Sequence, residues 1–328
     1  MNPKRLLGIA MIVFAAAVTL IGFGIGPDGS SLKTQSAAAE GMGTLLDFAL
    51  IGDTRYTTEQ QQKFLNLITD MNKYDLAFIV HDGDIKAGSN ACSDNIYTET
   101  RDLFNQFAAP LIYSPGDNEW TDCHRAGGNS LERLDFVRKV FFPNNMSMGQ
   151  KKMALEQQER YPENARWTYG GVTFATLHIV GSNNNIGRTP EHDNEYVQRN
   201  IANLNWMTQT FDIAKANGSI GVMLIMQANM WDNTPPSELI GFGDTLRQME
   251  RDVLDFGRPV VLVNGDSHYY RVDKPLMGSK SMRRIENFTR VETFGTDDVH
   301  WLRVTIDPKD PQVFMFRQQI VEANRVKH

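Results

Sequence analysis

The chain has 328 residues, 41% of them hydrophobic and 22% charged, which is enough to bury a full core in one domain or at most two. Its formal net charge of -6 and pI near 5.7 exclude a sequence-wide basic surface of the kind that binds the phosphate backbone of nucleic acids. We therefore expect no nucleic-acid partner, whereas a small phosphorylated substrate is compatible with this charge. The sequence does not indicate an oligomeric state.

The first forty residues differ in composition from the rest. Lys4 and Arg5 precede an apolar run over residues 6–25, and a Gly/Ser/Ala-rich stretch follows and ends in Ala37–Ala39. This pattern predicts a signal peptide, or an N-terminal membrane anchor with a linker, over residues 1–40. Cleavage and retention are both left open, because the run is long enough to span a bilayer and a small-residue cleavage site follows it. Either way we expect export to the periplasm, the extracellular space or a membrane surface, with membrane contact only through this segment.

The sequence contains two cysteines, Cys92 and Cys123. After export, a pair of cysteines is more often bonded than free, so we expect a disulfide that joins two loops. Two unpaired small hydrophobic residues are the alternative, because sequence alone does not show whether the Cα atoms come within about 4.4–6.8 Å of each other.

Residues 44–322 alternate strand-like and helix-like segments without an internal repeat, which predicts one α/β domain. In chain order the patterns predict a strand at 45–51, a helix at 57–72, a strand at 75–81, a helix at 98–107, strands at 111–113 and 172–180, a helix at 194–216, strands at 220–226 and 259–263, and a final pair at 301–306 and 312–316. Thr57 and Gln60 predict a capping box for the first helix. The third helix is expected to bury an apolar stripe of Val197, Ile201, Leu204, Met207, Phe211 and Ala214.

Four of the predicted strands are followed by Gly-Asp, at Asp53, Asp84, Asp117 and Asp266, and His268 comes two residues after the last. One such acid is more often a turn residue than a ligand. Four acids and a histidine favour convergence at one site, because ligands collect at the carboxyl ends of strands in open α/β sheets. Carboxylates brought so close repel one another unless a cation or a proton lies between them, which predicts a metal site, and this donor set suits Mg²⁺, Mn²⁺ or Ca²⁺, with iron and zinc possible.

These segments resemble the strand-end motifs of the calcineurin-like metallophosphoesterases, over most of residues 45–270. The matching segments are Gly52-Asp53-Thr54-Arg55, Gly83-Asp84, Gly116-Asp117-Asn118-Glu119, Gln227 and Gly265-Asp266-Ser267-His268. The resemblance implies a calcineurin-like phosphoesterase domain over residues 44–322. It also implies the fold class, α/β, with a β-sandwich of mixed sheets flanked by helices in four layers, α/β/β/α.

The resemblance makes Asp84 a bridging carboxylate between two metal ions. Asp53 and His268 would be ligands of one ion, and the other ion would be held by Asp117, Gln227 and Asp266. Arg55 stands where the family has a histidine ligand, and a guanidinium has no lone pair for a metal. We therefore expect Arg55 to bind a phosphoryl oxygen and the group around Asp117 to be the better-formed metal site, with one or two divalent ions per chain.

The resemblance also implies in-line attack on phosphorus by a metal-activated water. Asn118 stands where the family has a histidine that can protonate the leaving group, and an amide cannot act as a general acid. His124, in the loop that the expected disulfide would hold, is the candidate to replace that histidine. The alternative for His124 is an exposed loop residue.

Two functions are compatible with these residues. The first is an exported, metal-dependent phosphoesterase. The second is a catalytically inactive relative that binds an anionic or phosphorylated ligand. We prefer the enzyme, because the changes at Asp117 and Asp266 exchange one type of ligand for another, whereas a decaying site would lose its ligands to small residues.

Overall fold

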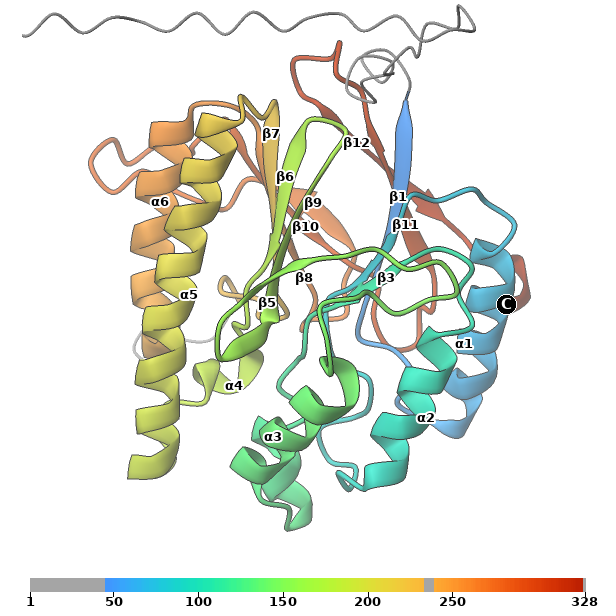
Figure 1. The fold of residues 1–328 in the computed structure, drawn as a ribbon. Helices are drawn as coiled ribbons and strands as arrows, with labels where there is room; N and C mark the ends of the chain where they lie inside the picture. The colour runs from blue at the N-terminus through green and yellow to red at the C-terminus, as the bar shows by residue number, and fades with distance from the viewer. Residues whose placement is uncertain (1–44, 233–238, 327–328) are drawn as a thin grey trace, which may run out of the picture. The chain divides into compact units, whose positions relative to one another are not determined.

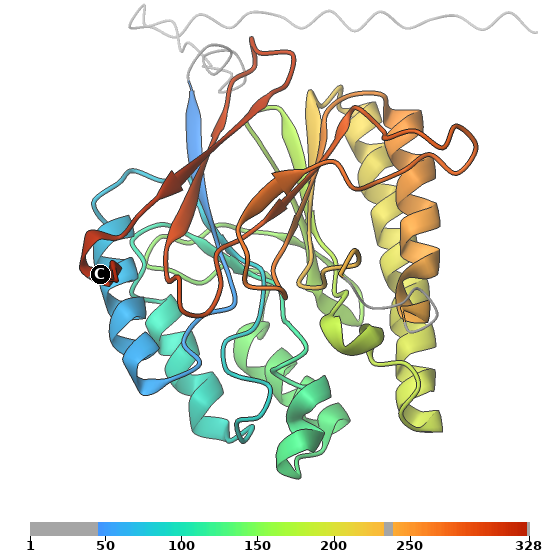
Figure 2. The same ribbon diagram turned by 180° about the vertical axis from the view of Figure 1, so that it is seen from behind.

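The computed structural model describes residues 45–232 and 239–326; the expected signal peptide or anchor at 1–40 lies outside them. Two mixed sheets face each other, and helices cover their outer faces (Figures 1 and 2). This arrangement confirms the four-layer α/β/β/α prediction. Within the part of the chain that the structure describes, no helix is both long and apolar enough to cross a membrane.

The first sheet has the strand order β12-β11-β1-β2-β3. Strands β1, β2 and β3 are parallel, and β11 and β12 add antiparallel neighbours. The bounds are β1 Leu46–Ile51, β2 Ile79–His81, β3 Leu111–Tyr113, β11 Trp301–Ile306 and β12 Phe314–Gln319.

The second sheet has the order β4-β5-β6-β7-β8-β10-β9, with β6, β7, β8 and β10 parallel. Its strands are β4 Glu156–Gln158, β5 Tyr161–Tyr169, β6 Val172–Thr176, β7 Gly221–Ile225, β8 Val260–Asn264, β9 Arg271–Asp273 and β10 Phe288–Glu292. The helices are α1 Thr58–Met71, α2 Asp94–Phe104, α3 Ser130–Phe141, α4 Gly181–Asn184, α5 Pro190–Ala216 and α6 Gly243–Phe256, with short 3₁₀ turns η1 Thr121–Ala126, η3 Ile240–Phe242 and η4 Glu322–Asn324.

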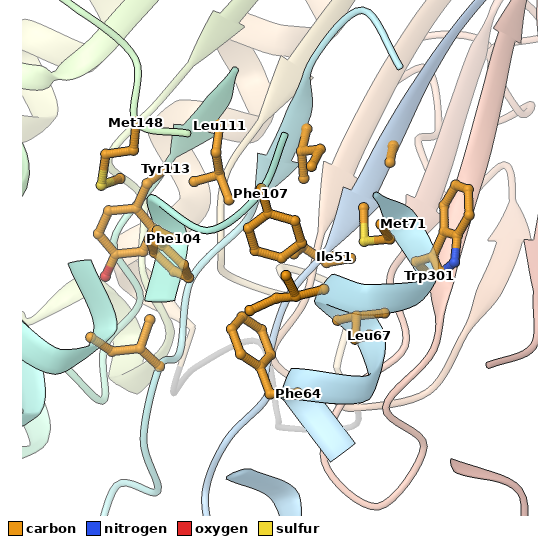
Figure 3. Close-up of a cluster of buried hydrophobic side chains, with 14 of the residues drawn as sticks. Ile51, Phe64, Leu67, Met71, Phe104, Phe107, Leu111, Tyr113, Met148 and Trp301 are labelled. Carbon is orange, nitrogen blue, oxygen red and sulfur yellow. The ribbon is translucent and has the colours of Figure 1, made fainter. Parts of the chain in front are cut away.

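Alternating side chains of the central strands fill separate cores. In β1, Phe48 and Leu50 enter the layer between the sheets, while Ala49 and Ile51 enter the layer under the helices. Figure 3 shows the helix-side cluster, where Phe64 and other residues of α1 pack over Ile51. Because both faces of these strands are covered, the sequence shows them as continuous apolar runs.

Several predicted boundaries were wrong. Helix α2 begins four residues before the predicted start at 98, and α5 begins at Pro190 instead of 194. Val197 and Ile201 were expected in the core but are 45% and 53% exposed. The first turns of α5 bury polar side chains instead, among them Arg199, which is 0% exposed and bonds to the His178 carbonyl.

The predicted cap of α1 is present with one difference. The Thr57 side chain accepts a hydrogen bond from the Gln60 backbone N–H. The Gln60 side chain, however, accepts from the backbone N–H of Tyr56, one residue earlier than in a capping box. This bond fixes the backbone of Tyr56, a residue of the loop that follows β1.

Candidate metal centre and active site

The carboxyl ends of strands from both sheets meet at one edge, near α4 in Figure 1. Asp53, Asp84 and Asp117 follow β1, β2 and β3 of the first sheet, and Gln227 and Asp266 follow β7 and β8 of the second. Contacts join the two groups: the Asp266 backbone N–H donates to Asp53 Oδ1 at 3.0 Å, and Gln227 Nε2 donates to Asp84 Oδ2 at 3.2 Å. The predicted convergence of the strand-end residues is therefore present.

Four residues of this edge have left-handed backbone conformations. The φ angles are 45° at Asp53, 60° at Asp84, 79° at Asp266 and 60° at His268. Each such angle costs a non-glycine residue about 1–2 kcal/mol, so the surrounding structure must hold it in place. Strain of this kind is common at functional sites, and here it turns side chains of three loops, those after β1, β2 and β8, toward one another.

Asp53, Asp84 and His268 form a group that could hold a metal ion. Each offers one ligand atom, and these atoms all lie within 4.8 Å of one another. The Tyr56 hydroxyl adjoins the group, 3.1 Å from Asp84 Oδ2 and 3.2 Å from His268 Nε2. Sequence reasoning missed Tyr56, although its place three residues after Asp53, in the same strand-end loop, was an available signal.

The electrostatics of the edge also favour a cation. Burial, and then the neighbouring carboxylates, raise the pKa of Asp53 and Asp84 well above the usual range. The same causes raise the pKa of Asp117 to about 8, and burial raises that of Asp266 to about 6. Burial lowers the pKa of His268, which keeps the imidazole neutral, as a metal ligand must be. With its oxygens and one neutral nitrogen, the donor set fits a divalent ion that would allow the carboxyls to ionise.

Gln227 does not present an oxygen to these acids, contrary to the prediction. Its Oε1 accepts a hydrogen bond from the Gly181 backbone N–H at 2.6 Å. Its Nε2 faces the acids and donates to Asp84 Oδ2 and Asp117 Oδ1, each at 3.2 Å. The group of Asp117, Gln227 and Asp266, which was predicted to be the better-formed metal site, is therefore less suited to bind a metal. The group of Asp53, Asp84 and His268 is better suited.

Arg55 also lies elsewhere than predicted. Its guanidinium turns to α2, where it contacts Thr100 Oγ1 and lies 3.4 Å from the Ile96 carbonyl oxygen. The left-handed φ of 80° at Arg55 directs this side chain away from the acids, while the next residue, Tyr56, reaches Asp84. The structure therefore does not place Arg55 where the expected contact with a phosphoryl oxygen would be made.

Asn118 lies at the predicted place. Its Nδ2 donates to Asp84 Oδ2 at 2.8 Å and to the Tyr56 hydroxyl at 3.2 Å. The next residue, Glu119, holds the loops together, since its Oε1 accepts from the Tyr113 hydroxyl at 2.5 Å and from the Gly116 N–H at 3.2 Å. Glu119 supports the site and does not belong to the group that could bind a metal.

The expected disulfide between Cys92 and Cys123 is confirmed, with the Cα atoms 5.6 Å apart. It holds η1, the turn that carries His124. His124 is exposed, and its Nδ1 lies 2.8 Å from the Thr121 carbonyl of the same turn. Among the residues that the structure describes, no hydrogen bond joins His124 to the acids, and the alternative of an exposed loop histidine fits this placement.

Arg125, the next residue, is the basic side chain of η1 that reaches the rim. Its Nη1 lies 2.7 Å from Asp122 Oδ2, and its Nη2 donates to Ser182 Oγ at 3.3 Å. Ser182 in turn donates to Asp117 Oδ2 at 2.8 Å. The guanidinium is half exposed, so it stands at the rim with donors left for an incoming anion.

Comparisons with known proteins agree with this fold. No family model and no curated protein match the sequence. Among solved structures, one titled "Structure of PhoD" is 11% identical, with a TM-score of 0.55 over 82% of this chain and 65% of that one. Purple acid phosphatase PPD1 from yellow lupin (Lupinus luteus) seeds is 10% identical, with a TM-score of 0.51 over 88% of this chain and 53% of that one.

The two sheets, their covering helices and the acidic strand-end site define the class: the chain has the calcineurin-like metallophosphoesterase fold. The sequence resemblance is thus confirmed at the level of the fold. This chain matches less than two thirds of the length of either neighbour, and the similarity shows a shared fold.

Proposed function

We propose that the chain is an exported, metal-dependent phosphoesterase that hydrolyses a small phosphorylated substrate. The observation that carries the proposal is the group of Asp53, Asp84 and His268: their ligand atoms lie within 4.8 Å of one another, all three residues have left-handed backbone conformations, and both aspartates are buried. Structural neighbours with the same fold include a purple acid phosphatase, which supports phosphate-ester chemistry. Export follows from the N-terminal pattern alone.

The position of each residue at the site suggests its role. Asp53, Asp84 and His268 would hold the ion, with the Tyr56 hydroxyl beside them. When bound, a divalent ion supplies Lewis-acid stabilisation of a phosphoryl oxygen and lowers the pKa of water. Asn118 Nδ2 is placed to donate to a phosphoryl oxygen, a role in which a neutral amide still serves.

The site favours leaving groups that need no protonation. Asn118 cannot supply a proton, and His124 lies outside the acid group. Burial raises the pKa of Tyr56 well above its usual value, so its phenol holds its proton tightly and is a poor general acid near neutral pH. We therefore expect aryl phosphates, whose leaving phenolates are stable, to be cleaved faster than alkyl phosphates.

The alternative function is a non-catalytic protein that binds an anionic or phosphorylated ligand. The orientation of Gln227 favours it, because an N–H group occupies the gap between Asp84 and Asp117 where the resemblance places a metal ligand. The two functions differ in turnover and agree in ligand binding.

The test is hydrolysis of 4-nitrophenyl phosphate and bis(4-nitrophenyl) phosphate by the purified full chain, stripped with chelator and supplied in turn with Mg²⁺, Mn²⁺, Ca²⁺, Zn²⁺ or Fe²⁺. We expect turnover with at least one ion and its loss in Asp84→Asn, because Asp84 belongs to the candidate metal group and accepts hydrogen bonds from Tyr56, Asn118 and Gln227. Binding of inorganic phosphate without turnover in any of these conditions would establish the alternative.

A further inference from the structure

The amide of Gln227 is fixed in one orientation. Gln227 is 0% exposed, and its stem packs so closely on Gly83 that a Cβ there would lie 2.8 Å from Gln227 Cγ. All three hydrogen-bonding groups of the amide are used, by the Gly181 N–H on one side and by Asp84 and Asp117 on the other. The Gln227 side chain is therefore a fixed structural part of the site.

Turning the amide over would be costly on both sides. The NH₂ group would then face the Gly181 N–H, which lies 2.6 Å from the present oxygen, and two donors would oppose each other. The amide oxygen would face Asp84 and Asp117, and it would oppose their oxygens whenever these acids are ionised. Buried donors and acceptors that lack a partner are destabilising, so the neighbours of the amide determine its orientation.

The chain also supplies a buried positive charge two residues after Asp84. Lys86 is 2% exposed, and its Nζ donates to the carbonyl oxygens of Ala87 and Asn90 at 2.9 and 3.0 Å. Its ammonium attracts the buried carboxylates, including Asp84 and Asp117. With the Gln227 NH₂ group between those two acids, groups of the protein itself offset part of the negative charge on this half of the edge.

We propose that the Gln227 amide takes the place of a second cation between Asp84 and Asp117, so that the chain binds one divalent ion, at Asp53, Asp84 and His268. The proposal rests on the metal site of the proposed function and specifies its stoichiometry. The N–H donors neutralise part of the carboxylate charge and occupy the space that a second ion would need.

The variant Gln227→Glu tests this directly, because it keeps the shape of the side chain. One carboxylate oxygen can still accept from the Gly181 N–H, while the other turns the donor between Asp84 and Asp117 into an anionic oxygen ligand. We expect the wild type to bind one equivalent of Mn²⁺ and Gln227→Glu to bind two, measured by isothermal titration calorimetry and by metal analysis after dialysis. Mn²⁺ electron paramagnetic resonance should show an isolated ion in the wild type and a spin-coupled pair in the variant.

Gln62→Glu is the matched control, since it makes the same chemical change on the exposed face of α1 and should leave one equivalent bound. Binding of two equivalents of Mn²⁺ by the wild type would by itself overturn the proposal. A folded Gln227→Glu that still binds one ion would overturn it as well. If the wild type bound no ion, both this proposal and the proposed metal site would be wrong. If it bound one ion but hydrolysed no substrate, the stoichiometry would be supported and only the proposed enzymatic activity would be contradicted.

Discussion

At the scale of single residues, the Tyr56 phenol links the possible metal ligands. Its oxygen lies within 3.2 Å of both Asp84 Oδ2 and His268 Nε2, so it fixes the spacing of two residues that come from different sheets. Groups that orient metal ligands in this way change metal affinity by about 10–100-fold when they are removed. The same contacts hold the loops after β1, β2 and β8 next to one another.

Tyr56→Phe should therefore weaken Mn²⁺ binding by about tenfold or more, because the ring remains while the hydroxyl contacts are lost. Titration calorimetry measures the change in Kd. Tyr269→Phe is the control, since Tyr269 is adjacent to His268 in sequence but 68% exposed, and it should bind as the wild type does. Equal affinities in all three proteins would show that the Tyr56 hydroxyl does not organise the ligands.

Arg125 carries a prediction about substrate affinity. Its half-exposed guanidinium is tethered to Asp122 and has donors left at the rim of the site. Arg125→Ala should raise KM for 4-nitrophenyl phosphate by about tenfold with little change in kcat, as expected when a contact to the bound anion is lost. Arg101→Ala, which removes an arginine paired with Asp102 on α2, should leave KM unchanged. A fall in kcat at constant KM would contradict this role.

Residue identity predicted the acids but not the direction of every side chain. Gly-Asp at strand ends placed Asp53 and Asp84 correctly, because parallel strands of one sheet end at the same edge. Gln227 could not be assigned, since its orientation depends on the N–H of Gly181, 46 residues earlier in the chain. Arg55 was expected at the acids, but its left-handed φ, which the sequence does not reveal, directs it away, and Tyr56 reaches Asp84 instead.

At the scale of elements, the disulfide ties the loop before α2 to η1, across a sequence separation of 31 residues. The fold was largely predictable at this scale where apolar runs were continuous, as in β1 and β8. It was not predictable for β5, whose sequence YPENARWTY mixes charged and aromatic residues and shows no apolar run. Its polar side chains are paired with residues of neighbouring elements; Arg166, for example, forms an ion pair with Glu156 of β4.

The double variant Cys92→Ser/Cys123→Ser should lower the free energy of unfolding by about 2–4 kcal/mol, the range for a loop of this length. It should also raise KM for 4-nitrophenyl phosphate, because η1 carries Arg125. Urea unfolding and steady-state kinetics measure the two effects. If stability fell while KM stayed the same, the disulfide would support the fold without placing Arg125.

At the end of β2, His81 makes stability depend on pH. Burial, and then the charge of Arg55, lower its pKa from 6.5 to about 3. Between pH 6.5 and about pH 3, His81 is protonated in the unfolded chain but neutral in the folded chain. The free energy of unfolding therefore decreases by about 1.4 kcal/mol for each unit by which the pH is lowered in this range. His81→Asn should reduce this slope in urea unfolding with chelator present. An equal slope in both proteins would assign the acid sensitivity to other groups.

At the scale of the whole molecule, the candidate metal group joins the two sheets. Asp53 and Asp84 follow strands of the first sheet, whereas His268 follows β8 of the second. An ion bound by all three residues would connect the strand ends of the sandwich, at the edge where like charges otherwise oppose close packing. The metal is thus expected to affect folding as well as activity.

Removing the ion should therefore lower the Tm of the whole domain. Binding to the folded state alone stabilises it by about 2.7 kcal/mol when the free ion is at a hundred times its Kd, so chelator should shift the Tm by several degrees. Differential scanning calorimetry with and without Mn²⁺ measures the shift. His268→Ala, which removes the ligand from the second sheet, should abolish most of it, and an equally large shift in that variant would show that the ion does not bridge the sheets.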